Sequence, residues 1–260
     1  MKLQTKSDTH WYTRVGVPAY DADMRRARKE NLVPSVTTIW GNTIRNYAID
    51  LYVKSQLLYA ASTFPNPQEL SGELLCQAWL TDSEEHAKKA REFGTSIHEA
   101  LEGFFRGQPI AEPLKKFTDP VLKYLSDEKI RPLEIEKSFC CPKNLYGGKI
   151  DLIAEKNNKL IVIDFKTKAT KGEKIKFYDD YLIQLVAYHR GITFPQHFEQ
   201  ELMSIVISSD EPGKYLSKTY QPNDEDSQDA WECFLSAFRI WKRKNKWNKV
   251  VDVKQEVMVA

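Results

Sequence analysis

The chain has 260 residues, 42% of them hydrophobic, and a formal net charge of only +2. This length and hydrophobic content fit one large globular domain with a substantial core, and the near-neutral charge excludes a uniformly basic surface. A nucleic-acid-binding surface would have to come from local clustering of lysine and arginine. No apolar run reaches the length of a membrane span, and the first residues lack the core of a signal peptide, so we expect a cytoplasmic protein with no membrane partner.

The four cysteines predict free thiols. They are Cys76, Cys140, Cys141 and Cys233, and no two of them have the C-x-x-C spacing of a zinc or redox motif. Cys140 and Cys141 are neighbours in a predicted strand, so their side chains would point to opposite faces.

Helices dominate the predictions for the first third of the chain. Ser35 can cap a short helix that follows it. Apolar residues recur at helical spacing from Tyr47 to Ala61, and a proline-rich tetrapeptide ends that helix. A second helix is predicted over residues 68–80, and Asp82 with Glu85 gives a capping-box-like start to a longer one. Aromatic residues in such helices are usually core, although one exposed tyrosine could stack on a base.

The segment from Gly94 to Phe105 predicts an amphipathic helix with polar residues on the flank of its buried stripe. His98 and Glu102 lie one turn apart on that flank. A lone histidine there is usually a satisfied rim residue, and a metal ligand is the alternative. The predicted stripe consists of Ile97, Leu101, Phe104 and Phe105.

The most informative stretch is a predicted β-hairpin whose two-residue loop is Asn157-Asn158. In that register Asp151 faces Asp164, and Lys149 faces Lys166. Period-two alternation places these four side chains on one face. The other face would carry Ile150, Leu152, Ile163 and Phe165.

The facing aspartates, Asp151 and Asp164, predict a cation site. Directly opposed residues have Cβ atoms roughly 4.5–5.5 Å apart, and two carboxylates placed so repel unless a positive charge lies between them. Oxygen ligands without cysteine favour Mg²⁺ or Mn²⁺ over zinc. Lys166 would project beside Asp164, where an ammonium group can position a water and stabilise charge on a phosphate. The alternative is a surface hairpin with a solvated charged face.

Further elements are predicted around the hairpin. A helix interrupted at Pro120 and a strand from Leu133 to Cys141 precede it, and Glu136 on that strand could face the site or solvent. A basic loop over residues 168–176 follows, which is either a solvated loop or a phosphate contact.

The last third is predicted to contain two helices and two strands. Asp179 or Asp180 would cap a helix over Tyr181–Arg190, on which Gln184 and Tyr188 share a face. Strands are predicted over residues 201–209 and 214–220, and an amphipathic helix begins at Asp224.

Three short motifs in this order resemble the PD-(D/E)XK nuclease superfamily. They are Gly148-Lys-Ile-Asp151, Asp164-Phe-Lys-Thr-Lys168 and Gln184-Leu-Val-Ala-Tyr188. The likeness is to the RecB-like branch, which includes the mitochondrial genome maintenance exonuclease and many phage exonucleases, and it covers residues 94–191 with a further match at 34–38. It implies an α/β fold: a restriction-endonuclease-like mixed β-sheet core flanked by helices, with a helical N-terminal region. Some members of this branch hold an iron–sulfur cluster through one early and three late cysteines. That spacing is absent here, so we expect no cluster.

The resemblance also implies roles for individual residues. The catalytic residues would be Asp151, Asp164 and Lys166. One or two Mg²⁺ or Mn²⁺ ions would be held by His98, Asp151, Asp164 and the Phe165 carbonyl, with Glu102 and Glu136 as candidates behind these ligands. DNA would be contacted by Gln184, Tyr188, Lys149, Ser35, Thr37 and Lys168. For Ser35 the capping role alone is an equal alternative.

These features together predict a metal-dependent deoxyribonuclease. We expect an exonuclease that hydrolyses phosphodiester bonds from single-stranded or duplex DNA ends, in recombination, repair or phage DNA metabolism. It would act in the cytosol of a bacterium or a phage-infected host, with a single-strand annealing or binding protein as a candidate partner. The alternatives are an endonuclease of the same chemistry and a catalytically silent nucleic-acid-binding module.

We expect residues 1–260 to form a single nuclease domain. It would comprise a mostly helical region over 1–93, the nuclease core over 94–220, and a C-terminal helix and tail over 221–260.

Overall fold

The centre of the protein is a five-stranded mixed sheet, seen in a computed structural model that describes residues 10–44, 47–194 and 199–247. The strand order follows the chain: β3 (Arg131–Cys140), β4 (Gly147–Lys156), β5 (Lys159–Lys168), β6 (Glu199–Ser208) and β7 (Tyr215–Tyr220). All neighbouring strands are antiparallel except β5 and β6, which are parallel. The structure therefore confirms the predicted mixed sheet and the strands assigned to it.

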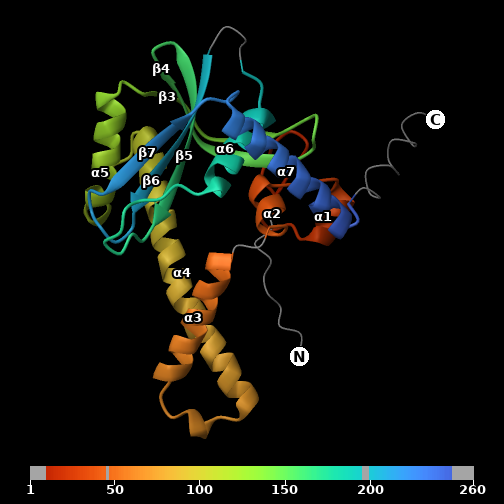
Figure 1. Ribbon diagram of the computed structural model, residues 1–260, viewed down its shortest axis with the longest axis vertical. Helices are drawn as coiled ribbons and strands as arrows, with labels where there is room; N and C mark the ends of the chain where they lie inside the picture. The colour runs from red at the N-terminus through yellow and green to blue at the C-terminus, as the bar shows by residue number, and fades with distance from the viewer. Residues whose placement is uncertain (1–9, 45–46, 195–198, 248–260) are drawn as a thin grey trace, which may run out of the picture.

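Helices cover both faces of this sheet (Figure 1). One face packs against α4 (Gly72–Phe105) and α5 (Glu112–Asp127), and the other against α6 (Asp179–Gly191) and α7 (Glu225–Lys244). The core is accordingly divided by the sheet into two clusters of buried side chains. This is the predicted α/β architecture, a restriction-endonuclease-like sheet flanked by helices.

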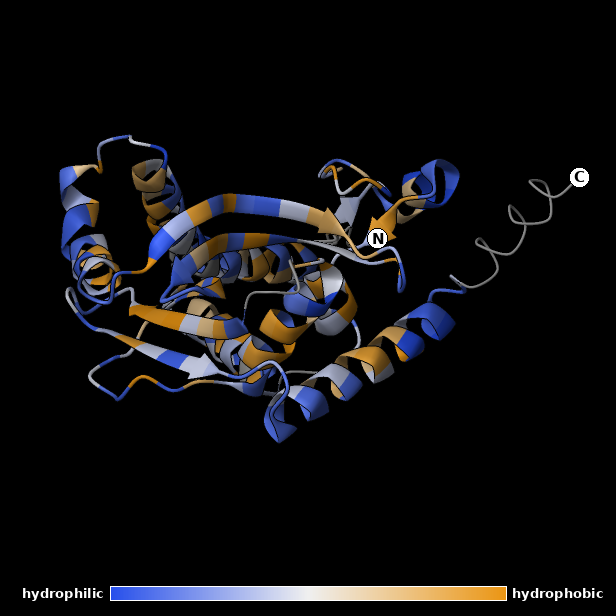
Figure 2. Ribbon diagram, turned by 90° about the horizontal axis from the view of Figure 1, so that it is seen from above, coloured by the Kyte–Doolittle hydropathy of each residue, from blue (hydrophilic) through white to orange (hydrophobic). Residues whose placement is uncertain are grey.

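The amphipathic helix predicted to begin at Asp224 is α7. Bands of hydrophobic and hydrophilic residues alternate along it (Figure 2). The Asp224 carboxylate caps the helix by accepting from the Ser227 amide at 2.8 Å, and the helix buries Phe234, Phe238 and Trp241. The tail over residues 248–260 lies outside the described residues.

The N-terminal region is helical, as predicted. Its first part contains two short strands, β1 (Trp11–Tyr12) and β2 (Val33–Pro34), and two short helices, α1 (Met24–Glu30) and α2 (Val36–Gly41). The following helix, α3 (Tyr47–Thr63), packs along α4, and the two form an arm that extends beyond the sheet (Figure 1). A single 3₁₀ turn, η1 (Pro67–Glu69), connects them. No helix of the described ranges is both long and apolar enough to cross a bilayer.

The helix predicted to begin at Asp82 does not exist as a separate element. α4 is one continuous helix of 34 residues, and Asp82 and Glu85 lie inside it. The residues from Ser83 to Glu92 are mostly strong helix formers without glycine or proline, so nothing in this stretch interrupts the backbone hydrogen bonds. The capping-box spacing was therefore a misleading signal.

Three other local predictions are wrong. α5 continues through Pro120 without a break. Proline removes one backbone amide donor, and the buried apolar side chains of α5 stabilise the helix in spite of this loss. Phe104 is 47% exposed, whereas Ile97 and Leu101 are buried as predicted. Neither Asp179 nor Asp180 caps α6; both lie in its first turn, where their charge complements the helix dipole.

The register of the β4–β5 hairpin is confirmed where the two strands pair. Lys156 pairs with Lys159 and Leu152 with Ile163, and both loop asparagines have positive φ, as this tight turn requires. The pairing ends at Leu152, so Asp151 and Asp164 stand just beyond it. From there β4 stays paired only with β3, while β5 stays paired with β6. The sheet is therefore split between the two aspartates.

The predicted division of the hairpin into two faces is wrong beyond this point. Lys149 and Lys166 are not cross-strand partners. Ile150 belongs to the cluster under α6, whereas Leu152, Ile163 and Phe165 belong to the cluster under α4. On β3, Glu136 has a left-handed backbone with φ of 53°, and the β3–β4 ladder is interrupted there, between the pairs of Ile135 and Lys137.

Candidate active site

Asp151 reaches across the split in the sheet. Its Oδ2 accepts a hydrogen bond from the Phe165 amide of β5 at 2.8 Å, in place of the carbonyl that a continuous ladder would supply. Asp164 is 2% exposed. Burial, together with repulsion from Asp164, raises the pKa of Asp151 well above its ordinary value. The two carboxylates thus stand close enough together, in a buried place, to repel each other.

Lys166 is held on the other side of Asp164 by α6. Its Nζ lies 2.6 Å from Asp164 Oδ2 and donates to Gln184 Oε1 at 2.9 Å. Gln184 Nε2 donates to Asp164 Oδ1 at 3.2 Å and to the Tyr188 hydroxyl at 2.6 Å. Because both amide hydrogens are used, the Gln184 oxygen is turned toward Lys166. The spacing that put Gln184 and Tyr188 on one helix face is confirmed.

His98 approaches from the opposite face, on α4. Its Nδ1 lies 3.7 Å from Asp151 Oδ2. Burial lowers the pKa of His98 to about 4, so the ring is neutral at pH 7 and offers a lone pair. Gly94, one turn earlier, allows this approach: a Cβ there would lie 2.5 Å from Thr167 Oγ1 on β5.

The donor set fits a hard divalent cation. Among the described residues, no group of three His, Cys, Asp or Glu side chains forms a preassembled metal centre. The reason is that the Phe165 amide occupies one oxygen of Asp151 and the Lys166 ammonium is paired with one oxygen of Asp164. Carboxylate oxygens such as those of Asp151 and Asp164 are the ligands that Mg²⁺ and Mn²⁺ prefer.

A cleft of about 960 Å³ reaches the site at His98 and Asp151, whereas Asp164, Lys166 and Gln184 do not line it. Its floor includes His98 and Asp151, one wall comes from α3 and α4, and the other wall comes from the end of β5. Its lining includes Tyr52 and also Lys171, which belongs to the predicted basic loop. Sequence reasoning missed three other lining residues: Arg91, Thr95 and Ser209. Of these, Arg91 carried a usable signal, because it lies two turns before His98 on the same helix.

Four of the remaining predicted site residues line the cleft. Lys149 and Glu136 form an ion pair with each other, and both line the cleft, as does Lys168. Glu102 also lines it, and pairs with Arg106 at 2.9 Å.

Ser35 and Thr37 do not line the cleft. The buried Ser35 hydroxyl accepts from the Thr38 amide at 2.9 Å, which confirms its capping role. Thr37 is exposed, and its hydroxyl lies 3.0 Å from that of Ser35. A backbone bridge from Ser35 to Gly147 brings this segment to the start of β4.

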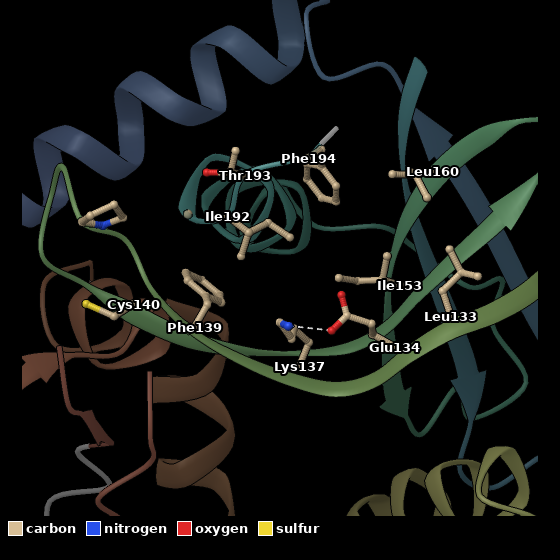
Figure 3. Close-up of a pocket in the computed structure, with 12 residues that line it drawn as sticks. Leu133, Glu134, Lys137, Phe139, Cys140, Ile153, Leu160, Ile192, Thr193 and Phe194 are labelled. Atoms are coloured by element: carbon tan, nitrogen blue, oxygen red, sulfur yellow. Dashed lines mark hydrogen bonds and ion pairs between the residues drawn. The ribbon is translucent and has the colours of Figure 1, made fainter. Parts of the chain in front are cut away.

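A second cavity, of about 470 Å³, lies between the edge strand β3 and the end of α6 (Figure 3). It is largely apolar, with a Glu134–Lys137 ion pair of 2.6 Å at its rim. None of the predicted site residues lines it.

Residues 114–193 match the sequence model of the PD-(D/E)XK nuclease superfamily. This segment holds both aspartates, Lys166 and the Gln184–Tyr188 pair. The match confirms the predicted resemblance to this superfamily, whose members generally use divalent metals such as Mg²⁺ or Mn²⁺. His98 lies outside the matched segment, and the RecB-like branch stays a prediction.

Solved structures give weaker likenesses. A putative exonuclease from Eubacterium rectale is 12% identical with a TM-score of 0.37, covering 59% of this chain and 68% of its own. The protein SSO0001 is 16% identical with a TM-score of 0.29, covering 76% and 86% of the two chains. No curated protein sequence matches the chain significantly.

Proposed function

We propose that this chain is a metal-dependent deoxyribonuclease that degrades DNA from an end. The observation that carries the proposal is the convergence of Asp151, Asp164 and Lys166 where β4 and β5 separate. His98, the two aspartates and the Phe165 carbonyl would hold the Mg²⁺ or Mn²⁺. Such an ion, when bound, neutralises phosphate charge and makes a coordinated water more acidic.

Lys166 is the residue best placed to act on the attacking water and the phosphate. Its ammonium is fixed by Asp164 Oδ2 and Gln184 Oε1, so one of its three hydrogens remains to point elsewhere. That N–H can hold the water or donate to a phosphoryl oxygen as negative charge develops. Gln184 maintains this orientation because it is bonded to Lys166 and Asp164, and it also donates to the Tyr188 hydroxyl.

A requirement for a DNA end is proposed from the arm beside the cleft. The arm of α3 and α4 forms one wall, on which His98 lies. Tyr52 of α3 lines the cleft with 41% of its surface exposed, so it is the exposed tyrosine that could stack on a base. A wall on this side restricts access to the site and favours a strand that enters from its terminus and is held mainly through its backbone.

The test is digestion of end-labelled single-stranded and duplex oligonucleotides with and without Mg²⁺, alongside closed circular DNA of the same sequence. We expect metal-dependent shortening of the linear substrates and persistence of the circles. Rapid cutting of circular single-stranded DNA would favour the endonuclease alternative. Binding without any metal-dependent cleavage would favour the silent binding module.

We further propose that residues 1–260 act as a single nuclease domain. One buried cluster joins Trp11 and Ile39 of the N-terminal region to Ile150 of β4 and to Phe234 and Trp241 of α7. The boundaries at residues 93 and 220 would then separate regions of one domain. The cytoplasmic location, the role in recombination, repair or phage DNA metabolism, and the annealing partner belong to the same proposal.

A further inference from the structure

The loop that follows β5 is anchored by two acidic residues from the turn after β6. Asp210 accepts from the Thr170 amide at 2.7 Å through Oδ1 and from the Lys171 amide at 2.9 Å through Oδ2. Glu211 Oε2 accepts from the Gly172 amide at 3.1 Å. Three consecutive main-chain donors thus end on two carboxylates, at the point where the parallel strands β5 and β6 both finish.

Buried hydroxyls complete this anchor. Ser208 Oγ donates to Asp210 Oδ1 at 2.8 Å and accepts from the Glu211 amide at 3.0 Å. Thr170 Oγ1 lies 2.7 Å from Ser208 Oγ, and both side chains are buried. The amide hydrogen bonds, despite a smaller opposing effect of desolvation, lower the pKa of Asp210, so it stays charged and keeps its acceptors.

The anchor determines where Lys171 points. Lys171 has φ of 49°, a left-handed conformation that a lysine adopts only when its surroundings hold it, and Gly172 follows with φ of 79°. The residue lines the active-site cleft, on the wall opposite Arg91. Among the described residues its ammonium has no ion-pair partner. By contrast, Lys176 pairs with Glu173 at 3.3 Å and Lys214 pairs with Glu211 at 2.7 Å.

We propose that Lys171 binds a phosphate of the nucleic acid in the cleft and that Asp210 is the positioning residue that holds it there. The inference rests on the proposed function, because it assumes a nucleic-acid strand between the two walls. An acidic residue beside such a cleft repels phosphate in general, yet here its charge is directed inward to the main-chain amides. The loop is ordered before the substrate arrives, so less conformational freedom is lost on binding.

The first experiment is fluorescence anisotropy of a labelled oligothymidylate bound to the full chain in EDTA, repeated over a series of salt concentrations. Lys171→Ala should weaken binding about 5- to 10-fold at low salt, as expected for one charge-assisted hydrogen bond. The slope of log K against log salt should fall by about 0.7, the value for one phosphate contact on a single strand. Lys174→Ala is the matched control, because Lys174 is an exposed lysine of the same loop that does not line the cleft.

Asp210→Asn separates positioning from simple charge. Removing a negative charge should tighten binding if Asp210 acts only through its field. Positioning predicts the opposite, a loss similar to that of Lys171→Ala, because the asparagine oxygen cannot accept both amides. The double variant should bind no more weakly than either single variant. If Asp210→Asn does not fold by circular dichroism, Asp210→Ser takes its place in the same cycle.

Two results overturn the inference: an unchanged affinity and salt slope in Lys171→Ala, or tighter binding by Asp210→Asn. Cleavage of the labelled oligonucleotide with Mg²⁺ is measured in parallel on the native chain. Binding that follows the expected pattern without cleavage would contradict the proposed function and support the inference. Cleavage with no effect of Lys171→Ala would support the proposed function and overturn the inference.

Discussion

Gln184 connects three functional groups at the residue scale. It bonds to Lys166, Asp164 and Tyr188, and Asp164 in turn pairs with Lys166. Without the amide, the Lys166 ammonium keeps its carboxylate but loses the second contact that fixes its direction. Gln184 therefore acts on the rate through Lys166 more than on the affinity for DNA.

We predict that Gln184→Ala lowers kcat about 10- to 100-fold with a much smaller change in KM, because an interaction that orients a catalytic group is lost. Single-turnover cleavage at saturating enzyme measures this. Tyr188→Phe is the matched control, since it keeps Gln184 in place and removes only the hydroxyl. A large rise in KM with normal kcat would instead make Gln184 a substrate-binding residue.

A pH prediction follows from His189, on the buried side of α6. Its Nε2 lies 2.5 Å from Gln200 Oε1, and the ring stacks on Phe194. Burial lowers the pKa of His189 below its ordinary value of 6.5. The unfolded chain therefore binds a proton more readily than the folded chain, and stability falls as the pH drops below 6.5 toward the folded value.

His189→Gln should remove this part of the pH dependence. Urea unfolding of both chains between pH 7.5 and pH 5 measures it, and the native midpoint should fall more steeply than the variant midpoint. Parallel curves would show that His189 does not titrate differently in the folded state.

The sequence predicted which residues come together better than it predicted the backbone around them. A two-residue loop determines the hairpin register, so Asp151 and Asp164 could be predicted to lie across from each other. The end of the pairing at Leu152 could not be predicted, because the alternation of residues continues past it. The loop over residues 168–176 was a candidate phosphate contact, but its place beside Ser209 could not be predicted, since the two meet only where two parallel strands end together.

At the scale of elements, α4 brings His98 to the site. Gly94 lets it approach β5 closely, and His98 follows one turn later. We predict that Gly94→Ala lowers activity and stability, because a clash that typically costs about 1–3 kcal/mol exceeds the gain of about 1 kcal/mol from replacing a helical glycine. Adding Thr167→Ala should restore activity and stability in the double variant, since the new Cβ would clash with Thr167 Oγ1. Thermal unfolding and cleavage rates together test this, and an unrescued double variant would contradict it.

The arm of α3 and α4 is expected to bind bases rather than phosphates. Tyr52→Ala should weaken binding of a single-stranded oligonucleotide about 5- to 10-fold or more, because base–aromatic stacking contributes about 1–3 kcal/mol, and should leave duplex affinity unchanged. Tyr59→Ala is the control: Tyr59 lies two turns further along α3, is 58% exposed and does not line the cleft. Equal losses of affinity in both variants, measured by anisotropy, would mean that the tyrosines affect binding only by stabilising the fold of the arm.

At the scale of the whole molecule, the site is assembled from both helical layers. α4 brings His98 to one side of the split sheet and α6 brings Gln184 to the other. The fold class followed from strand and helix patterns, because hydrophobic periodicity is a local property. The direction of the arm could not be predicted from these patterns, because the arm extends away from the sheet only through the continuity of α4 across residues 82–85.

The most direct test of the account is cleavage of end-labelled DNA with Mg²⁺ by the native chain, Asp164→Asn and Lys166→Ala, each compared with its DNA affinity. Both variants should lose cleavage by about 10³-fold or more while binding stays within about 3-fold, because these groups serve the transition state more than the ground state. Near-normal turnover by either folded variant would contradict the assignment of the active site to the split between β4 and β5.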